Sequence, residues 1–551
     1  MHPQERLAEL LSRFDHDGVC LAELLCDRHD PDAVAFTIGS LSGADQEVRY
    51  GELQRRSRSL AAALAHLGLA PGDRIATLLE PGPDLPAVLL GIWRAGAVAV
   101  PLYTGFAPAA IAIRLRACGT GLVLCDARHR NLLPAGELAP TESRAEAGSR
   151  YRVVYVGGQA PSGQLQLDRL IDRAEHEDWP VPDLVGDGDT EFVRMFTSGT
   201  TGDPKGVPVT YRAVAAFQSY LEGALDVTEE AYWNAGDPGW AYGLYYAIIA
   251  PLAAGRRSIL VAGASRRLRW DLIARLGVTH LAAVPTAYRT LQRSGGPPPS
   301  GLALRRLTAA GEPLTADVVA WAQETLGLTI HDHFGQTELG MCAGRAWHPE
   351  LADPADPAAL GRALPGWTLA VLSGDDQPVP PGVIGRLAID VPASPAMWFI
   401  GYVDAPERTA ERFRGDGRWY LTGDAGSIDE DGYLSYVGRD DDVIISGGYR
   451  IGPTEVEEVL LADPRVAQAA VVGVPDPLRG QRIEAFVVLD REVALDTRIE
   501  EDLQRRVRIT LAEYAHPHLV HVVAQLPASR RGAVQRHVLR ELPRTCRGGS
   551  A

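Results

Sequence analysis

Helix-type and strand-type patterns alternate along the first half of this 551-residue chain. Apolar residues recur at helical spacing over residues 50–67, and a short strand pattern over 74–79 precedes a Pro-Gly-Pro turn at 81–83. A second helix is predicted over 85–95 and a second strand over 98–102. Such alternation is typical of helices layered on largely parallel sheets. The sequence therefore predicts an α/β fold.

A polar run at residues 438–442 marks the best candidate for a domain boundary. It lies between predicted strands over 433–437 and 443–445, and about 110 residues of mixed helix and strand pattern follow it, enough for a small domain. We therefore expect two domains, residues 1–440 and residues 441–551.

Composition excludes several classes of partner. A formal net charge of −16 gives no support to nucleic-acid or anionic-membrane binding, which need clustered cations. The six cysteines are scattered without a CxxC pair, so reduced thiols are expected rather than a zinc site. The first 11 residues lack a signal-peptide core, and the most apolar stretch, 85–101, is too short and interrupted to span a bilayer. We expect a cytoplasmic protein; its oligomeric state, including a homodimer, stays open.

The strongest chemical signal is the segment Phe-Thr-Ser-Gly-Thr-Thr-Gly-Asp-Pro-Lys-Gly-Val at residues 196–207. Its glycines let the backbone approach an anion, its hydroxyls donate hydrogen bonds, and its lysine adds a positive charge. The spacing differs from a Walker A loop. A flexible turn is the alternative, and the ordered run of twelve residues favours a phosphate-binding loop. The candidate phosphate-binding residues are Thr197, Ser198, Gly199, Thr200, Thr201 and Lys205.

Further motifs follow in order along the chain, and each taken alone has a structural explanation. They are Gly311-Glu312-Pro313, the run Asp332-His333-Phe334-Gly335-Gln336-Thr337-Glu338, Asp424 after a Thr-Gly turn, Gly438-Arg439, and Gly447-Gly448-Tyr449-Arg450-Ile451. Asp424 alone is a common turn residue, and Glu338 alone is a common helix cap. His331 and His333, without a third ligand nearby, are interpreted as structural rather than metal-binding.

The order and spacing of these motifs resemble the signatures of the adenylate-forming (ANL) superfamily, over about residues 30–540. That superfamily includes acyl-CoA ligases, peptide-synthetase adenylation domains and luciferases. The resemblance implies a large adenylate-binding domain of several subdomains, with parallel-rich sheets, helices and a small β-barrel-like part. It also implies a small α+β C-terminal domain that rotates about a hinge at Asp441.

The resemblance assigns roles to the motif residues. Phe334 offers an aromatic face to adenine, Asp424 holds both ribose hydroxyls, and Glu338 is the expected Mg²⁺ ligand. Catalytic roles are expected for Thr197, Lys205, Glu338 and Arg450. The remaining nucleotide-binding residues implied are Ser198, Gly199, Thr200, Thr201, Gly311, Glu312, Pro313, Asp332, His333, Gly335, Gln336, Thr337, Arg439 and Arg450.

Within the superfamily the chain is most similar to medium-chain and related acyl-CoA ligases, through residues 233–240, 441–452 and 473–480. Coenzyme A is then the expected acceptor, with binding residues Gly447, Gly448, Tyr449 and Arg479. Acetate-using relatives carry a tryptophan where this chain has Gly335, so an acid larger than acetate is expected. Trp240, Tyr242, Tyr245 and Phe217 are candidates for the acyl-pocket wall or, equally, for the core.

Ala533 stands where the family has a catalytic lysine that bridges carboxylate and α-phosphate during adenylation. The sequence therefore predicts an enzyme weak in adenylation that converts a supplied acyl-AMP and coenzyme A to acyl-CoA and AMP. A separate adenylating ligase is then an expected partner, and Mg²⁺ is needed only if ATP is used. Ala528, Arg531 and His537 also depart from the family pattern, which favours a natural change over an engineered one.

Three alternatives stay open. The first is a complete ATP-dependent ligase in which Arg530 or Arg531 supplies the missing charge. The second is a non-catalytic protein that binds an acyl-adenylate or nucleotide. The third is transfer of the acyl group to a carrier protein instead of free coenzyme A.

Overall fold

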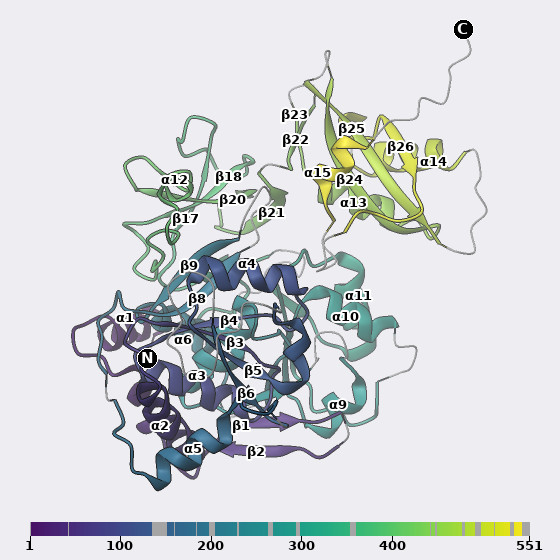
Figure 1. Cartoon of the computed structure of the whole chain (residues 1–551). Coiled ribbons are helices and arrows are strands. Elements are labelled where there is room, and N and C mark those ends of the chain that lie inside the picture. Colours follow the sequence, from purple (N-terminus) through teal and green to yellow (C-terminus); the bar gives the residue numbers. More distant parts are fainter. Residues whose placement is uncertain are drawn as a thin grey trace. The chain divides into compact units, whose positions relative to one another are not determined.

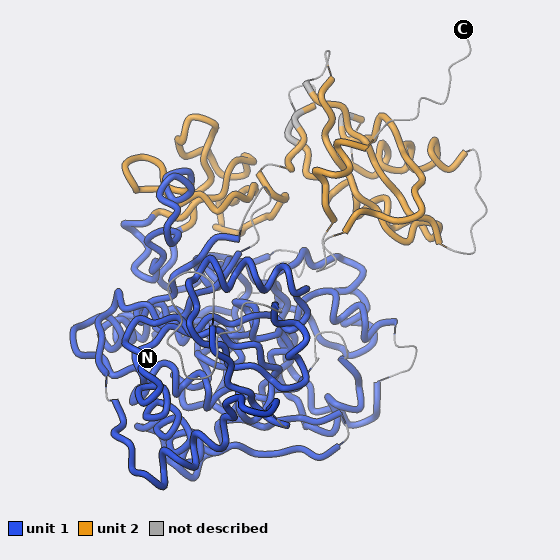
Figure 2. Tube along the Cα trace, viewed as in Figure 1, with its two compact units in different colours: residues 1–368, 391–411 blue, residues 369–390, 412–551 orange. Residues whose placement is uncertain are grey.

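The chain forms two compact units, which Figure 2 colours separately: residues 1–368 with 391–411, and residues 369–390 with 412–551. The structure is a computed structural model. It describes residues 2–41, 43–134, 151–158, 160–182, 184–197, 204–228, 231–262, 268–293, 298–352, 360–440, 442–446, 449–476, 480–490, 498–511, 513–528 and 534–542.

The first unit contains a seven-stranded sheet of order β7-β6-β5-β3-β4-β8-β9 (Figure 1). Its neighbours pair in parallel except β8 and β9, which form an antiparallel hairpin at one edge. The central strands are almost wholly buried, as expected where both sheet faces are covered. The strands are β3 (Arg74–Leu78), β4 (Val98–Pro101), β5 (Leu122–Asp126), β6 (Arg152–Val156), β7 (Leu165–Gln166), β8 (Glu191–Thr197) and β9 (Lys205–Thr210).

A nine-stranded sheet in the same unit has the order β16-β15-β14-β13-β12-β10-β11-β1-β2. Its six central strands pair in parallel, and antiparallel strands close both edges. The strands are β1 (Val34–Gly39), β2 (Gln46–Arg49), β10 (Tyr232–Asn234), β11 (Ser258–Val261), β12 (His280–Ala283), β13 (Arg306–Ala310), β14 (Ile330–Gln336), β15 (Gly340–Gly344) and β16 (Arg362–Ala363).

Helices occupy the connections between these strands. The α-helices are α1 (Pro3–Phe14), α2 (Tyr50–His66), α3 (Asp84–Arg94), α4 (Pro108–Cys118), α5 (Leu167–His176), α6 (Ala213–Ser219), α7 (Ala241–Gly243), α8 (Ala250–Ala254), α9 (Trp270–Arg275), α10 (Pro285–Arg293), α11 (Ala316–Leu326) and α12 (Pro406–Ala410). Short 3₁₀ or π segments are η1 (Glu23–Asp27), η2 (Ala127–Leu132), η3 (Tyr220–Ala224) and η4 (Leu244–Ile249). Their apolar faces and the sheets form the core of the unit.

The second unit begins with a curled antiparallel sheet of order β17-β18-β20-β19, in which β21 also pairs with β20. Its strands are β17 (Leu369–Leu372), β18 (Gly385–Asp390), β19 (Phe413–Arg414), β20 (Trp419–Ile428) and β21 (Leu434–Arg439). This sheet is the small barrel-like part that the family resemblance implies.

The rest of the second unit is an α+β fold with a mixed sheet of order β23-β22-β25-β24 and β26 beside β25. Its elements are β22 (Ile444–Ser446), β23 (Tyr449–Ile451), α13 (Pro453–Leu461), β24 (Val466–Asp476), β25 (Gly480–Leu489), α14 (Ile499–Thr510), η6 (Glu513–Ala515), β26 (Leu519–Val522) and α15 (Arg536–Glu541). Val456, Leu460, Val471 and Leu503 lie at the centre of its own hydrophobic core. The predicted fold class is confirmed: α/β with parallel-rich sheets and a small C-terminal α+β part.

Candidate active site

The β8–β9 hairpin fixes both ends of the predicted phosphate loop. Thr197 ends β8, Lys205 begins β9, and the two residues are direct partners in the antiparallel ladder. The hairpin therefore brings together two residues that the sequence assigned to one site. Ser198, Gly199, Thr200 and Thr201 lie outside the described residues.

Tyr402 links Lys205 to Glu338, although the sequence motifs did not single it out. Its hydroxyl donates a hydrogen bond of 2.6 Å to Glu338 Oε1, and Lys205 Nζ lies 4.8 Å from the centre of its ring, a cation–π contact. The Glu338 and Tyr402 side chains are both buried. A buried carboxylate held by one hydrogen bond is the kind of oxygen ligand that Mg²⁺ takes in proteins.

The adenine motifs lie at neighbouring strand ends. β13 and β14 run in parallel with Ala310 opposite His333, so Gly311 follows β13 directly beside the segment that continues to Phe334. Gly311 has φ +87°, a backbone conformation that favours glycine. Glu312 accepts hydrogen bonds from the backbone N–H and the hydroxyl of Thr286, and Pro313 follows it. Carboxyl ends of parallel strands are where such sheets bind ligands.

Burial shifts the pKa values of three neighbouring residues of β14, His331, Asp332 and His333, and it shifts that of the carboxyl group in the opposite direction from those of the imidazoles. Burial raises the pKa of Asp332 to about 7 and lowers those of His331 and His333 to about 3 and about 4. His333 Nε2 donates to the Arg345 carbonyl at 2.7 Å, which leaves Nδ1 to accept from the Tyr220 hydroxyl at 2.5 Å. The neutral ring of His333 is thus fully partnered within the protein.

His331 is also held inside the fold. Its ring stacks on Trp347 with centroids 3.6 Å apart, and its Nδ1 donates to the Arg345 carbonyl at 3.1 Å. No group of three His, Cys, Asp or Glu side chains in the described part of the chain could hold a metal ion. Both histidines therefore have hydrogen-bond partners within the fold.

Gly335 is closely approached by β15, while its predicted place in the acyl pocket stays a prediction. A Cβ at this position would lie 2.1 Å from the Gly340 carbonyl oxygen and 2.7 Å from Met341 Cα. The register of β14 and β15 shifts between Phe334 and Gly335, and the glycine lets the two backbones approach at that bulge. Any side chain at residue 335 would therefore require β15 to shift.

Two separate aromatic clusters contain the predicted acyl-pocket residues. Tyr245 stacks on Phe217 with centroids 4.1 Å apart, and its hydroxyl donates to the Thr337 carbonyl at 3.0 Å, which ties this cluster to the β14 motif. Trp240 instead packs edge-on against Phe106, 5.1 Å away.

The first of these clusters extends to two more tyrosines. Tyr242 lies edge-on to Tyr246 at 5.6 Å, and the hydroxyl of Tyr246 accepts a hydrogen bond from the Met341 N–H at 2.7 Å. Gln336, the last residue of β14, is partly buried beside Thr337. Sequence reasoning did not single out Tyr246, because a run of neighbouring aromatic residues gives no signal that separates a pocket wall from a core.

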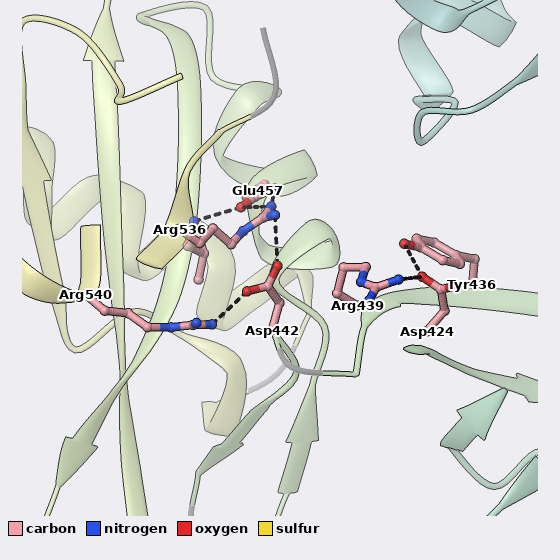
Figure 3. Close-up of polar contacts among 8 residues, drawn as sticks. Asp424, Tyr436, Arg439, Asp442, Glu457, Arg536 and Arg540 are labelled. Carbon is pink, nitrogen blue, oxygen red and sulfur yellow. Dashed lines mark hydrogen bonds and ion pairs between the residues drawn. The ribbon is translucent and has the colours of Figure 1, made fainter. Parts of the chain in front are cut away.

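Asp424 and Arg439 form an ion pair in the second unit (Figure 3). They are direct partners across β20 and β21, and Arg439 Nη1 lies 3.2 Å from Asp424 Oδ1. The Tyr436 hydroxyl donates to the same oxygen at 3.5 Å. Burial raises the pKa of Asp424, and the guanidinium of Arg439 opposes that shift. A buried, partly neutralised carboxylate is suited to accept hydrogen bonds from ribose hydroxyls.

A second set of ion pairs holds Asp442, the residue after the predicted hinge (Figure 3). Arg540 Nη2 donates to Asp442 Oδ1 at 2.7 Å, and Arg536 Nη1 lies 3.5 Å from Oδ2. Arg536 also makes bonds of 2.7 and 2.8 Å to the two carboxylate oxygens of Glu457 on α13. Helix α15 is therefore joined to α13 and to the start of β22.

Several predicted residues of the second unit lie outside the described residues: Asp441, Gly447, Gly448, Arg479 and Ala533. Tyr449 and Arg450 belong to β23, where Arg450 pairs with Ile445 of β22, and their side chains are not described. Ala528 and Val534, on either side of residues 529–533, form an antiparallel bridge.

In the described residues, no helix is both long enough and apolar enough to cross a bilayer.

Comparison with known proteins defines the class. The model of the AMP-binding enzyme family matches residues 26–402, and that of the AMP-binding enzyme C-terminal domain matches residues 455–533. The chain therefore belongs to the AMP-binding enzymes, the adenylate-forming superfamily that its motifs resemble.

Individual relatives narrow this class to the acyl-CoA synthetases, which are acid–thiol ligases. The chain is 31% identical to acetyl-coenzyme A synthetase of Bacillus subtilis, over 90% of this chain and 85% of the relative. It is 30% identical to rat mitochondrial acyl-coenzyme A synthetase ACSM3, over 91% of this chain and 85% of the relative. The Brucella canis acyl-CoA synthetase structure is 38% identical with a TM-score of 0.73, covering 97% and 96% of the two chains.

Proposed function

We propose that this enzyme makes acyl-CoA chiefly from a preformed acyl-adenylate: acyl-AMP and coenzyme A give acyl-CoA, AMP and a proton. The observation that carries the proposal is Ala533, at the position where the resemblance to the family implies a lysine. The coenzyme A thiolate forms the new bond to the acyl carbon, the bond from that carbon to the AMP oxygen breaks, and AMP leaves. A separate ligase must then supply the acyl-AMP.

Loss of the lysine at 533 acts on adenylation because that step joins two anions. Removing one well-placed donor typically costs about 3 kcal/mol, or a hundredfold or more in rate. Lys205 is the only lysine in the sequence, so no other lysine of this chain can take over. Arg530 and Arg531 are close in sequence, but a planar guanidinium does not reproduce the reach of an ammonium group.

The residues needed for the second step are retained. Phe334 is proposed to stack on adenine and Asp424 to hold the ribose hydroxyls, with Arg439 keeping that carboxylate in place. Gly447, Gly448, Tyr449 and Arg479 are proposed to receive coenzyme A after residues 441–551 turn about Asp441, with Arg450 beside the phosphate. Bulky or medium-sized acids are the proposed substrates, and the Phe217–Tyr245 pair near Thr337 is the proposed wall of the acyl pocket.

A complete ATP-dependent ligase is the second candidate, and one observation favours it. Lys205, Tyr402 and Glu338 form the kind of site that Mg²⁺ and polyphosphate require, which an enzyme restricted to thioester formation would not need. Bound Mg²⁺ would neutralise phosphate charge there, and Glu338 is the residue that would hold it.

The test offers the full-length enzyme two mixtures. The first contains acyl-AMP and coenzyme A, with acyl groups from acetyl to benzoyl; the second contains the matching acid, MgATP and coenzyme A. We expect acyl-CoA from the first mixture at a rate at least a hundredfold above the second. Comparable rates would establish the complete ligase, and tight acyl-AMP binding without product would establish a binding protein.

A further inference from the structure

The segment from Trp398 to Val403 crosses between the two halves of the proposed phosphate and metal site. At one end, Trp398 Nε1 donates to the Leu339 carbonyl, directly after Glu338, at 3.0 Å. At the other end, the Val403 N–H donates to the Gly206 carbonyl, directly after Lys205, at 2.9 Å. The segment is therefore hydrogen-bonded next to each of the two charged residues.

Tyr402 lies within this segment with little freedom to move. Its N–H donates to Thr409 Oγ1 at 2.9 Å, and its ring packs edge-on to Phe399 at 5.0 Å. The hydroxyl is aimed at Glu338 Oε1 and the ring face is turned to Lys205 Nζ. One rigid side chain thus contacts the predicted metal ligand and the predicted phosphate cation together.

We propose that Tyr402 is a positioning residue that sets the Glu338 carboxylate and the Lys205 ammonium for a Mg²⁺-bound polyphosphate. This inference rests on the proposed role of Glu338 and Lys205. The bond from the Tyr402 hydroxyl to Oε1 fixes the orientation of the Glu338 carboxylate, which would hold Mg²⁺ when the nucleotide is bound. The ring face attracts the Lys205 ammonium through a cation–π contact, which limits where that ammonium lies.

Removing a residue that orients a metal ligand typically weakens metal binding about 10–100-fold. Tyr402→Phe removes the hydroxyl and keeps the ring, so it isolates the effect on Glu338. Tyr402→Leu removes the hydroxyl and the aromatic ring, so it abolishes the hydrogen bond to Glu338 and also the cation–π contact with Lys205. Tyr288→Phe is the matched control, because it also removes a buried hydroxyl in the same unit, one that lies within hydrogen-bonding distance of the carbonyls of Leu281 and Thr308.

Isothermal titration calorimetry of the full-length enzyme with ATP, with and without Mg²⁺, tests the proposal. We expect Tyr402→Phe to weaken MgATP binding about 10–100-fold and to change metal-free ATP binding little. Tyr402→Leu should weaken both, and Tyr288→Phe neither. In a Glu338→Gln background, Tyr402→Phe should add little, because it acts through that carboxylate.

Four results would overturn the proposal: no MgATP binding by the unaltered enzyme, no effect of Tyr402→Phe, an equal effect without Mg²⁺, or full additivity with Glu338→Gln. The proposed function is decided separately, by the rates of the unaltered enzyme in the two reaction mixtures. An enzyme that binds MgATP through Tyr402 and still fails to adenylate would satisfy both proposals.

Discussion

At the scale of single residues, burial sets the protonation of the β14 motif. Asp332 holds its proton to about pH 7 in the folded chain, whereas an unfolded aspartate releases it near pH 4. It therefore adds stability as the pH falls from about 7 to 4. His331 and His333 stay neutral in the fold and gain protons on unfolding below about pH 6.5, so they remove stability over much of the same range.

These opposite contributions give a prediction for Asp332→Asn. The substitution removes the carboxyl group whose protonation stabilises the fold on acidification, and it leaves the two histidines whose protonation on unfolding destabilises the fold. We expect the melting temperature to fall more steeply between about pH 6.5 and 4.5 than in the unaltered protein. Differential scanning fluorimetry over this range measures the slope. Parallel curves for the two proteins would contradict the prediction.

At the scale of elements, the meeting of β14 and β15 at Gly335 leaves no room for a side chain. We predict that Gly335→Ala destabilises the first unit by about 1–3 kcal/mol, the usual cost of overpacking. Urea unfolding followed by circular dichroism measures this. Gly121→Ala is the control, since a Cβ there meets nothing within 4 Å. Equal stability of the two variants would contradict the prediction, because it would mean that β15 shifts to accept the methyl group without loss of stability.

The local hydrophobic pattern predicted two strands of the first unit closely. Strands predicted over 74–79 and 98–102 are observed as β3 (Arg74–Leu78) and β4 (Val98–Pro101), because hydrophobic spacing along a buried strand is a property of neighbouring residues. The environment of Gly335 depends on a second strand and was not predictable in this way.

Contacts between residues distant in sequence gave no signal at all. Tyr402 meets Glu338 across 64 residues, and Arg540 meets Asp442 across 98. The motifs identified Glu338, and Asp442 belongs to the polar run at 438–442. Tyr402 and the arginines that contact these carboxylates gave no sign in the sequence of which residue they meet, so only the fold reveals the pairing.

At the scale of the whole molecule, each unit has a hydrophobic core of its own. Arg536→Met leaves the buried carboxylate of Glu457 without its bidentate partner, a loss of about 3–5 kcal/mol for a buried ion pair. We predict that calorimetry finds two transitions, and that this substitution lowers only that of the second unit. Gly335→Ala should lower only the transition temperature of the first unit.

Arg505→Met serves as the control for the arginine substitution, because Arg505 is exposed and its bond to Asp502 lies on the surface of α14. It should leave both transitions nearly unchanged. A single transition that moves with either core substitution would mean that the units unfold together.

The antiparallel β8–β9 hairpin also bears on how such a protein can diverge. A parallel pair of strands needs a crossover of a dozen or more residues, whereas a hairpin needs only a turn. Thr197 and Lys205 are paired at the end of the ladder, and in a hairpin the length of chain between such a pair helps to set the register. Divergence in the length of the predicted phosphate loop is therefore limited by the register of β8 and β9.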